Sequence, residues 1–269
     1  MSGLTESKAN GLISNSETVM KNIAVILAGG IGARVGGNTP KQLLPLSDGC
    51  SVLEHAVNAF EQSPCIDEVC IVMHPDYIAY AEQMLLTNAW QKVRNIIPGG
   101  KERWESSVNA IRQVRGERLE VKGKETNCQL PIANNHNTAN LLLHDAARPF
   151  VSQDIIARVC EALEEHEAVT VAIPSIDTVY EMVDGKVARI PQRSTIMRAQ
   201  TPQAFRLNLI AEAYAKALGV DSLSAEACAA CHLPATDDCG IIHAHMPNIP
   251  IHIVLGEEQN KKITFKEDI

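Results

Sequence analysis

Short apolar runs alternate with amphipathic stretches along most of this chain, and this alternation restricts the possible fold more than any other feature. We expect buried β-strands at the runs Ile23–Ala28, Glu68–Met73, Arg94–Ile97, Leu141–His144, Ala168–Ile173 and Ile251–Leu255. Apolar residues recur at helical spacing in Val52–Gln62, Tyr77–Leu86, Arg103–Val114, Asp154–Glu165 and Leu207–Leu218. Strands that alternate with helices favour an α/β fold built on a parallel sheet.

The composition agrees with one globular domain of this kind. The chain has 269 residues, of which 45% are hydrophobic, and this is enough apolar material for a sizeable core. We expect a Rossmann-like, mostly parallel twisted sheet with helices on both faces, in a single domain over residues 21–269. Residues 1–20 are mostly polar and are expected to form a flexible tail.

Charge and cysteine content exclude several classes of protein. The formal net charge of −8 argues against a general nucleic-acid-binding surface. No apolar run approaches the roughly 20 residues that a membrane-spanning helix needs. The 8 cysteines are scattered along the chain, so we expect mostly reduced thiols and a cytoplasmic protein.

Two segments interrupt the alternation of strands and helices. Residues 120–140 are mostly polar and predict a surface insertion. Residues 175–200 mix polar and apolar positions around the turn-forming pair Asp184-Gly185, which predicts a protruding β-arm. A two-stranded ribbon cannot bury a core of its own, so we expect the arm to pack on a second copy of the chain.

The loop after the first expected strand gathers glycines and cations. Gly29, Gly30 and Gly32 follow the strand directly, and Arg34 and Lys41 come next. The backbone amides of a glycine turn can approach an anion closely, and nearby cations offset the negative charge that grows when a phosphate is attacked. The loop therefore predicts binding of a nucleoside triphosphate.

This loop differs from two common phosphate-binding motifs. Val35 stands where the dinucleotide fingerprint requires its third glycine, and no Gly-Lys-Ser/Thr follows at P-loop spacing. An NAD(P) dehydrogenase on the same architecture is an alternative hypothesis. It would need that third glycine and an acidic ribose partner about 20 residues further on. Val35 and the basic Lys41 argue against it.

Further motifs follow in a fixed order along the chain. They are Pro40-Lys41-Gln42, Gly99-Gly100, Arg103-x-x-Ser106, His144-Asp145-Ala-Ala-Arg148-Pro149, Asp177-Thr178, Gln200-Thr-Pro-Gln203, Thr236-Asp237 and Asn260-x-Lys262-Ile-Thr264. Together with the glycine loop, this series resembles the 2-C-methyl-D-erythritol 4-phosphate cytidylyltransferases and the related ribitol-5-phosphate cytidylyltransferases. The resemblance covers nearly the whole expected domain. It implies an enzyme that joins CTP to a polyol phosphate with Mg²⁺ and releases pyrophosphate.

The resemblance also implies roles for residues around the nucleotide. The positions that wrap the triphosphate are matched by Ala28, Gly29, Gly30 and Gly32. Arg34 and Lys41 match the catalytic pair that holds the phosphates and stabilises the pentavalent state. Gly100 and Ser106 match the positions that recognise cytosine. Lys101 stands where an acidic or small residue is expected, so we assign no role to its side chain.

A second group of residues matches the polyol-phosphate pocket. Asp145 directly follows an expected strand and is the candidate ligand for Mg²⁺, which prefers carboxylate and phosphate oxygens. Its family counterpart also touches the polyol, and Arg148 matches a substrate-binding residue. The rest of the pocket is matched by Thr178, Arg193, Thr201, Thr236 and Lys262, with Thr178 and Arg193 reaching across from the partner's arm. Lys262 also matches a catalytic lysine that neutralises the reacting phosphates.

The choice between the two polyol phosphates stays open at this stage. The core His144–Pro149 and the ending Phe265-Lys-Glu-Asp268 favour methylerythritol phosphate, a precursor of isoprenoids. The stretch Ile190-Pro-x-Arg193 favours ribitol phosphate, which feeds wall or capsule polymers. We rank methylerythritol phosphate first because of the Ala-Ala-Arg-Pro core.

Two features have plainer interpretations. His144 at the end of a strand is expected to be a packed, hydrogen-bonded histidine and not a catalytic base. A zinc site is an alternative use of Cys228, Cys231, Cys239 and His243, in which case the chain would be a non-catalytic metal-binding protein. The stretch is rich in alanine, however, and small buried thiols are ordinary there.

Overall fold

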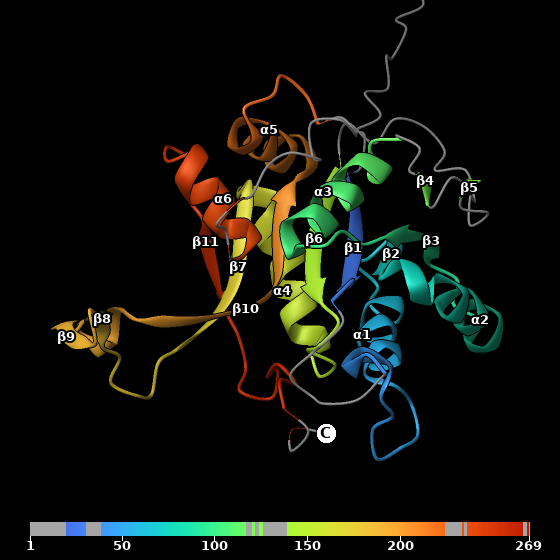
Figure 1. Cartoon of the computed structure of the whole chain (residues 1–269), viewed down its shortest axis with the longest axis horizontal. Coiled ribbons are helices and arrows are strands. Elements are labelled where there is room, and N and C mark those ends of the chain that lie inside the picture. Colours follow the sequence, from blue (N-terminus) through green and yellow to red (C-terminus); the bar gives the residue numbers. More distant parts are fainter. Residues whose placement is uncertain are drawn as a thin grey trace, which may run out of the picture.

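A seven-stranded sheet forms the centre of the protein, in the order β11-β7-β10-β6-β1-β2-β3 (Figure 1). This computed structural model describes residues 20–30, 39–116, 120–121, 124–125, 139–223, 233, 236–265 and 268. The strands are β1 (Lys21–Ala28), β2 (Glu68–Met73), β3 (Val93–Pro98), β6 (Ala139–Asp145), β7 (Ala168–Pro174), β10 (Met197–Arg206) and β11 (His252–Leu255). Neighbouring strands are parallel except where β10 pairs with β6 and with β7. The mostly parallel sheet predicted from the sequence is confirmed.

Helices cover both faces of the sheet. One face is covered by α1 (Val52–Glu61), α2 (Ile78–Asn88) and α4 (Gln153–Glu165). The other is covered by α3 (Arg103–Val114), α5 (Leu207–Leu218) and α6 (Asp238–His245). Single 3-10 turns, η1 (Lys41–Leu43), η2 (Pro75–Tyr77) and η3 (Arg193–Thr195), stand in the connections.

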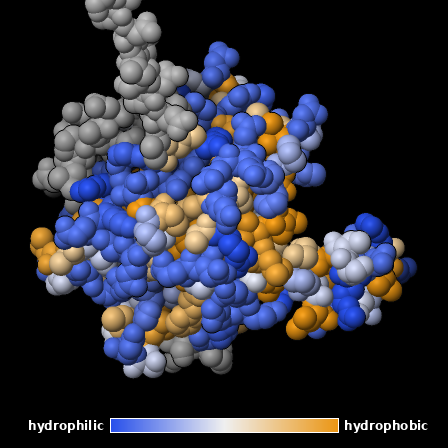
Figure 2. Space-filling view, turned by 180° about the vertical axis from the view of Figure 1, so that it is seen from behind, coloured by the Kyte–Doolittle hydropathy of each residue, from blue (hydrophilic) through white to orange (hydrophobic). Residues whose placement is uncertain are grey.

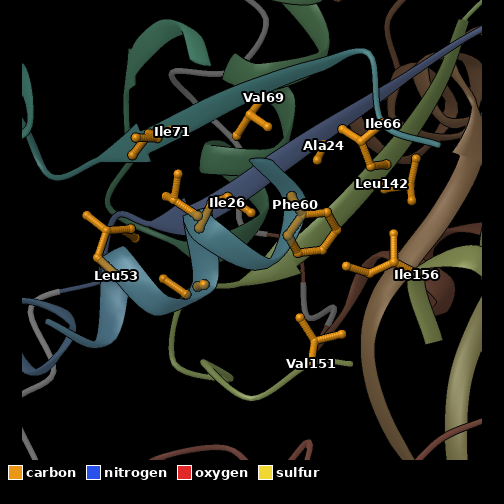
Figure 3. Packing of buried hydrophobic residues seen from close by; sticks show 14 of the residues in the cluster. Ala24, Ile26, Leu53, Phe60, Ile66, Val69, Ile71, Leu142, Val151 and Ile156 are labelled. Atoms are coloured by element: carbon orange, nitrogen blue, oxygen red, sulfur yellow. The ribbon is translucent and has the colours of Figure 1, made fainter. Parts of the chain in front are cut away.

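The pleat of β1 divides its apolar side chains between the two layers. Ile23 and Val25 point into the cluster under α3 and α5, whereas Ala24 and Ile26 point into the cluster under α1 and α4. Figure 3 shows this second cluster, in which Phe60 of α1 packs beside Ile26. Because β1 is buried on both faces, its sequence is a continuous apolar run and not an alternating one.

Side-chain caps fix where α1 and α4 begin. Ser51 accepts a hydrogen bond from the backbone of Glu54, and the Glu54 carboxylate accepts one from the backbone of Ser51. Such a capping box satisfies amides that the first helical turn leaves free and contributes about 1 kcal/mol. At α4 the cap is one hydrogen bond, which the side chain of Ser152 accepts from the backbone of Ile155. The backbone of Val52, the first residue of α1, donates a hydrogen bond to the carbonyl of Leu44, which connects the start of α1 to the end of η1, the turn that carries Lys41.

The predicted elements are found with three corrections. The strand β10 and the helix α6 were not expected from the pattern. The sheet strand β6 begins at Ala139, so residues 139–140 do not belong to the predicted insertion. The strand β10 begins at Met197, so residues 197–200 belong to the sheet and not to the predicted arm. In both cases polar residues that are buried in the sheet hide the strand from an apolar pattern.

The segment between β7 and β10 carries a projecting hairpin. Its strands β8 (Glu181–Val183) and β9 (Lys186–Arg189) pair antiparallel around Asp184 and Gly185, whose φ angles are 49° and 74°. Positive φ at both central residues suits the tight turn that joins two such strands. In Figure 1 this hairpin stands away from the body of the protein.

Other predictions fall on parts of the chain that the structure describes only in part. Within the insertion, β4 (Glu120–Val121) and β5 (Lys124–Glu125) form a short antiparallel pair, and residues 126–138 lie outside the described residues. Residues 1–19 of the predicted tail also lie outside them. Among the described helices, none combines the length and the apolar character that crossing a membrane requires.

Candidate active site

A cavity of about 570 Å³ lies at the carboxyl ends of β1 and β6. Its walls come from the ends of these strands, from η1, from the start of α3 and from residues 260–264, which we call the C-terminal segment. The lining residues are Leu27, Ala28, Gly29, Gly30, Lys41, Gln42, Gly100, Lys101, Glu102, Arg103, Ser106, Asp145, Ala146, Ala147, Lys262 and Thr264. Open parallel sheets bind ligands at this edge. Eight predicted site residues meet here: Ala28, Gly29, Gly30, Lys41, Gly100, Ser106, Asp145 and Lys262.

The buried side-chain amide of Gln42 holds the start of the glycine loop in place. The side chain of Gln42 donates to the backbone carbonyls of Ala28 and Gly30, both at 2.7 Å. A Cβ atom on Gly29 would lie 2.8 Å from Oγ of Ser106, so only glycine fits this close approach. Gly32 and Arg34, which were predicted to complete the loop, lie outside the described residues.

The turn after β3 forms the opposite wall of the cavity. Ser106 on α3 is buried, and its Oγ accepts a hydrogen bond from the backbone of Gly100 at 3.1 Å. A Cβ atom on Gly100 would lie 2.1 Å from Cβ of Glu105. The backbone of Lys101 is bound by Glu105, and its side chain is exposed. The first turn of α3 therefore faces the cavity with a fixed backbone, and amides at such a helix start favour anions.

Asp145 at the end of β6 is the ionised carboxylate of the cavity wall. Its Oδ2 lies 2.7 Å from Nζ of Lys262, and its Oδ1 lies 3.4 Å from Nε of Arg103. Burial alone would raise the pKa of Asp145, but the charges of Arg103 and Lys262 outweigh it and hold that pKa well below its usual range. The carboxylate therefore stays charged at neutral pH.

The C-terminal segment brings a second lysine contact to the same place. The backbone of Ile263 donates to the carbonyl of Ala147 at 2.8 Å, which docks the segment beside the end of β6. The carbonyl of Ile263 in turn accepts a hydrogen bond from Nζ of Lys41 at 2.8 Å. Lys41 and Lys262 thus line the same cavity although they are far apart in the sequence.

A buried hydrogen-bond chain supports Asp145 from behind. Oγ1 of Thr201 accepts from the backbone of Asp145 at 3.1 Å and lies 3.0 Å from Nδ1 of His144. Nε2 of His144 lies 3.0 Å from the carbonyl of Arg148. Burial lowers the pKa of His144 to about 4, so the ring is neutral and its Nε2–H donates to that carbonyl. The predicted packed histidine is confirmed.

Other predicted residues lie away from the cavity wall. The guanidinium of Arg148 donates to the carbonyls of Asn260 and Ala199, so it ties β10 to the C-terminal segment. Desolvation lowers the pKa of Arg148, against the opposing charge of Asp145. The side chain of Thr201 is buried in the support of Asp145. Exposed positions are occupied by Thr178, Arg193 and Thr236.

Three residues that organise the site had no role in the sequence analysis: Gln42, Arg103 and Asp238. Gln42 holds the glycine loop, and Arg103 bridges Asp145 and the buried Asp238. Gln42 and Arg103 do belong to two of the recognised motifs, Pro40-Lys41-Gln42 and Arg103-x-x-Ser106, and this membership could have indicated them. Of the predicted zinc ligands, Cys228 and Cys231 lie outside the described residues, while Cys239 is buried and His243 is exposed.

Comparisons with known proteins agree with this site. The family model for 2-C-methyl-D-erythritol 4-phosphate cytidylyltransferase matches residues 22–122 and 126–269. A protein of that name from Thermobifida fusca is 39% identical over 251 residues, which cover 91% of this chain and 89% of the relative. A bifunctional ribulose 5-phosphate reductase/CDP-ribitol pyrophosphorylase from Haemophilus influenzae is 33% identical, over 93% of this chain and 47% of the relative.

A solved structure with the same architecture shows the fold independently. It is the 4-diphosphocytidyl-2C-methyl-D-erythritol synthase from Anaerococcus prevotii, with a TM-score of 0.69 and 26% identity. The match covers 93% of this chain and 92% of that one. The α/β architecture of the described residues is therefore that of a known group of nucleotidyltransferases.

Proposed function

Because the chain belongs to the 2-C-methyl-D-erythritol 4-phosphate cytidylyltransferase family, we propose that it transfers the cytidylyl group of CTP to 2-C-methyl-D-erythritol 4-phosphate. The products are the CDP-alcohol and pyrophosphate. One observation carries the proposal at the level of the site. The glycine loop, two lysines and an ionised aspartate from distant parts of the chain line one cavity at the carboxyl edge of the sheet.

The reaction needs positioning and charge more than a protein nucleophile. A phosphate oxygen of the polyol phosphate attacks the α-phosphorus of CTP in line. The bond between the α-phosphorus and the oxygen that bridges it to the β-phosphorus breaks, and pyrophosphate leaves with that electron pair. Lys41 and Lys262 reach the cavity with flexible ammonium groups. They are proposed to hold the phosphates and to offset the charge that builds up on them. Arg34 is proposed to join them.

The start of α3 is proposed to select the base. The backbone of Gly100 and the glycine loop line the same cavity, and the base is proposed to bind between them, where a narrow slot would accept a pyrimidine and exclude a larger purine. The Oγ atom of Ser106 accepts a hydrogen bond from the backbone of Gly100. Its hydroxyl proton is proposed to be donated to the base. Ala28 and Gly29 form the floor of this slot, where the close packing of Gly29 on Ser106 excludes any side chain.

A divalent metal ion fits the chemistry of Asp145. This carboxylate is ionised and faces the cavity, and hard cations such as Mg²⁺ prefer carboxylate and phosphate oxygens. Asp145 is proposed to bind Mg²⁺ together with the phosphates of CTP. When bound, the ion would neutralise phosphate charge and align the α-phosphorus. Thr201 accepts a hydrogen bond from the backbone amide of Asp145, and His144 contacts Thr201 in turn, so the backbone that carries this carboxylate is held at the strand end.

The polyol phosphate is proposed to bind between the C-terminal segment and a partner subunit. Lys262 and Asp145 face that side of the cavity, and Thr236 lies exposed just before α6. Thr201 and Arg148 are proposed to shape this pocket from beneath. Thr178 and Arg193 lie on the projecting segment, so they serve this substrate only in the site of a second copy.

A homodimer is therefore part of the proposal. Large apolar side chains are exposed along the projecting segment, and Figure 2 shows them gathered on the arm and where it meets the body. They are Ile176, Val179, Tyr180, Met182, Val183, Val187 and Ile190. A monomer rarely leaves so contiguous an apolar surface in water. The proposed compartment is the cytoplasm, whose reducing conditions suit the free thiols of the described cysteines.

Ribitol 5-phosphate is the second candidate substrate. The relative from Haemophilus influenzae, whose name includes a CDP-ribitol pyrophosphorylase, favours it. Its match spans about half of that longer relative. The two substrates carry the same phosphate nucleophile on different polyols, so the phosphate-binding cations suit both.

Pyrophosphate release tests the proposal directly. The protein is incubated with CTP, Mg²⁺ and each polyol phosphate in turn, and the Lys41→Ala variant serves as the matched control. We expect release with methylerythritol phosphate and a large loss of kcat in the variant. Preference for ribitol 5-phosphate would replace the substrate and keep the nucleotide site. Failure with both polyols would contradict the proposed function.

A further inference from the structure

Arg103 on α3 lies between two carboxylates that belong to different parts of the fold. Its Nε is 3.4 Å from Oδ1 of Asp145, and its Nη1 is 2.7 Å from Oδ2 of Asp238 at the start of α6. The side chain of Asp238 is fully buried, and that of Arg103 is 27% exposed. One guanidinium therefore links the cavity wall to a charge in the protein interior.

Asp238 cannot move easily, because several buried groups hold it. Its Oδ1 accepts a hydrogen bond from the hydroxyl of Tyr214 at 2.6 Å. The backbone amides of Asp238 and Cys239 both donate to the side chain of Gln203, at 3.0 and 3.1 Å. Gln203 also donates to Asp237, the residue that caps α6. The carboxylate of Asp238 is thus fixed in position and in orientation.

The two cations on Asp145 differ in how firmly they are held. Arg103 is tied to Asp238, and leaving would strand a buried carboxylate without its counter-charge, which is very unfavourable. Lys262 is 44% exposed and sits on the C-terminal segment with a flexible ammonium group. A ligand that competes for Asp145 therefore displaces Lys262 more readily than Arg103.

We propose that Asp238 is a positioning residue of the active site: it fixes Arg103, which orients Asp145 toward the cavity and leaves Lys262 as the exchangeable cation. This inference rests on the proposed role of Asp145 as a metal ligand. With a metal ion and CTP bound, Asp145 would hold the ion in place of Lys262, and the ammonium group of Lys262 would then be available to the phosphates. Arg103 stays in place throughout.

A purely structural role for the Arg103–Asp238 pair makes a different prediction. If the pair only stabilises the fold, removing both charges together restores the stability and the metal binding that the loss of one charge lowers. If the pair orients Asp145, removing both charges restores stability but leaves Asp145 without its fixed partner. A charge-matched double variant separates the two cases.

The variants are Arg103→Met, Asp238→Asn and the double variant, with Arg115→Met at the end of the same helix as a control. Melting temperature reports stability. Calorimetric titration with CTP, with and without Mg²⁺ and with no polyol phosphate present, reports how much the metal increases CTP affinity. Asp145→Asn measures how much of that increase depends on the carboxylate.

We expect the melting temperature of Arg103→Met to be lower than that of the wild type, and the melting temperature of the double variant to return most of the way to the wild-type value. We also expect the metal-dependent gain in CTP affinity to fall at least fivefold in the double variant, close to the value for Asp145→Asn, and to stay unchanged in Arg115→Met. A double variant with the wild-type gain would overturn the positioning role and leave the metal site standing. A wild-type gain that does not depend on Asp145 would overturn the metal role and this inference with it.

If the double variant fails to fold, Asp238→Asn alone decides the matter. There the buried charge of Arg103 keeps only Asp145 as its partner, and the tighter pair competes with the metal. The Mg²⁺ concentration for half-maximal activity should then rise at least threefold at unchanged KM for the polyol phosphate. An unchanged Mg²⁺ requirement would overturn the proposal.

Discussion

The Nζ atom of Lys262 lies 2.7 Å from Oδ2 of Asp145, although 117 residues separate the two in the chain. Asp145 ends a central strand, and Lys262 belongs to a segment that docks on Ala147 through the backbone of Ile263. Asp145 therefore has Lys262 as a counter-charge only when the segment around Ile263 is docked. This relationship makes Lys262 the most informative residue to change.

Replacing Lys262 by glutamine should lower kcat by roughly 100-fold, with a much smaller change in KM for CTP. The lysine is proposed to meet phosphate charge that grows in the transition state, and such contacts act mainly on the chemical step. Steady-state kinetics with CTP varied would measure both constants. Lys261→Gln, an exposed neighbour, is the control and should behave like the wild type. A raised KM with unchanged kcat would mean that Lys262 only binds substrate.

Replacing Asp145 by asparagine should change stability in a pH-dependent way. The pKa of Asp145 is lower in the folded protein than in the unfolded chain, so the unfolded chain takes up the proton first as the pH falls. The stabilisation by the carboxylate is therefore present at neutral pH and is lost as the pH falls through its folded pKa. Urea unfolding should show the wild type about 2 to 3 kcal/mol more stable than the variant at pH 7. A gap that persists undiminished at pH 3 would refute this explanation.

His144 should produce a stability change in a higher pH range. Burial lowers its pKa to about 4, below the ordinary value of about 6.5, so the unfolded chain again binds the proton first. The stability gained from keeping the ring neutral is present above pH 6.5 and declines as the pH falls toward 4. His144→Gln should remove this component, which reaches up to about 1.4 kcal/mol per pH unit. Parallel unfolding curves at pH 7, 6 and 5 for the two proteins would contradict it.

The sequence pattern predicted the apolar elements of this fold well and the polar ones poorly. Val52–Glu61 and Leu207–Leu218 form helices where apolar spacing indicated them, because burial of one face drives their formation. The strand Met197–Arg206 was missed because Gln200, Thr201 and Gln203 are polar and yet buried. Those side chains form hydrogen bonds behind the site. Apolar periodicity cannot reveal a strand whose buried residues are polar.

The candidate site divides in the same way. The glycine loop and Asp145 both follow expected strands, and the carboxyl ends of parallel strands meet at one edge of a sheet, so the sequence alone predicts that they lie together. The bond from Lys41 to the carbonyl of Ile263 spans 222 residues. No local spacing encodes such a contact. The pairing of Arg103 with Asp238 likewise joins the first residues of α3 and α6, and only the assembled fold specifies it.

Two neighbouring glycines should respond differently to alanine. A Cβ atom on Gly29 would lie 2.8 Å from the buried Oγ of Ser106, whereas one on Gly30 would meet no atom of the described residues within 4 Å. Gly29→Ala should therefore lose about 1 to 3 kcal/mol of stability through overpacking, and Gly30→Ala should lose little. Gly30→Ala should still weaken CTP binding, because its methyl group enters the space proposed for the triphosphate. Thermal unfolding and CTP titration of both variants check this, and unaltered CTP binding by Gly30→Ala would argue against that placement.

The projecting hairpin supplies the last prediction. Met182 is 72% exposed and lies among other apolar residues of the arm, so the proposed dimer would bury it. A carboxylate placed there would lose its hydration on association, at a cost on the order of 3 kcal/mol or about 100-fold in the dimer dissociation constant. Met182→Asp should therefore be monomeric at micromolar concentration in light-scattering measurements.

The same variant also tests the shared site. Thr178 and Arg193 lie on the segment that carries Met182, so losing the dimer should raise KM for the polyol phosphate while CTP binding stays near the wild-type value. Leu86→Asp is the matched control, because Leu86 is 79% exposed on α2 and lies outside the arm. It should leave both the dimer and the KM unchanged. A monomeric Met182→Asp with wild-type kinetics would mean that each subunit completes its own site, and a wild-type protein that is already monomeric would remove the arm from the proposed function.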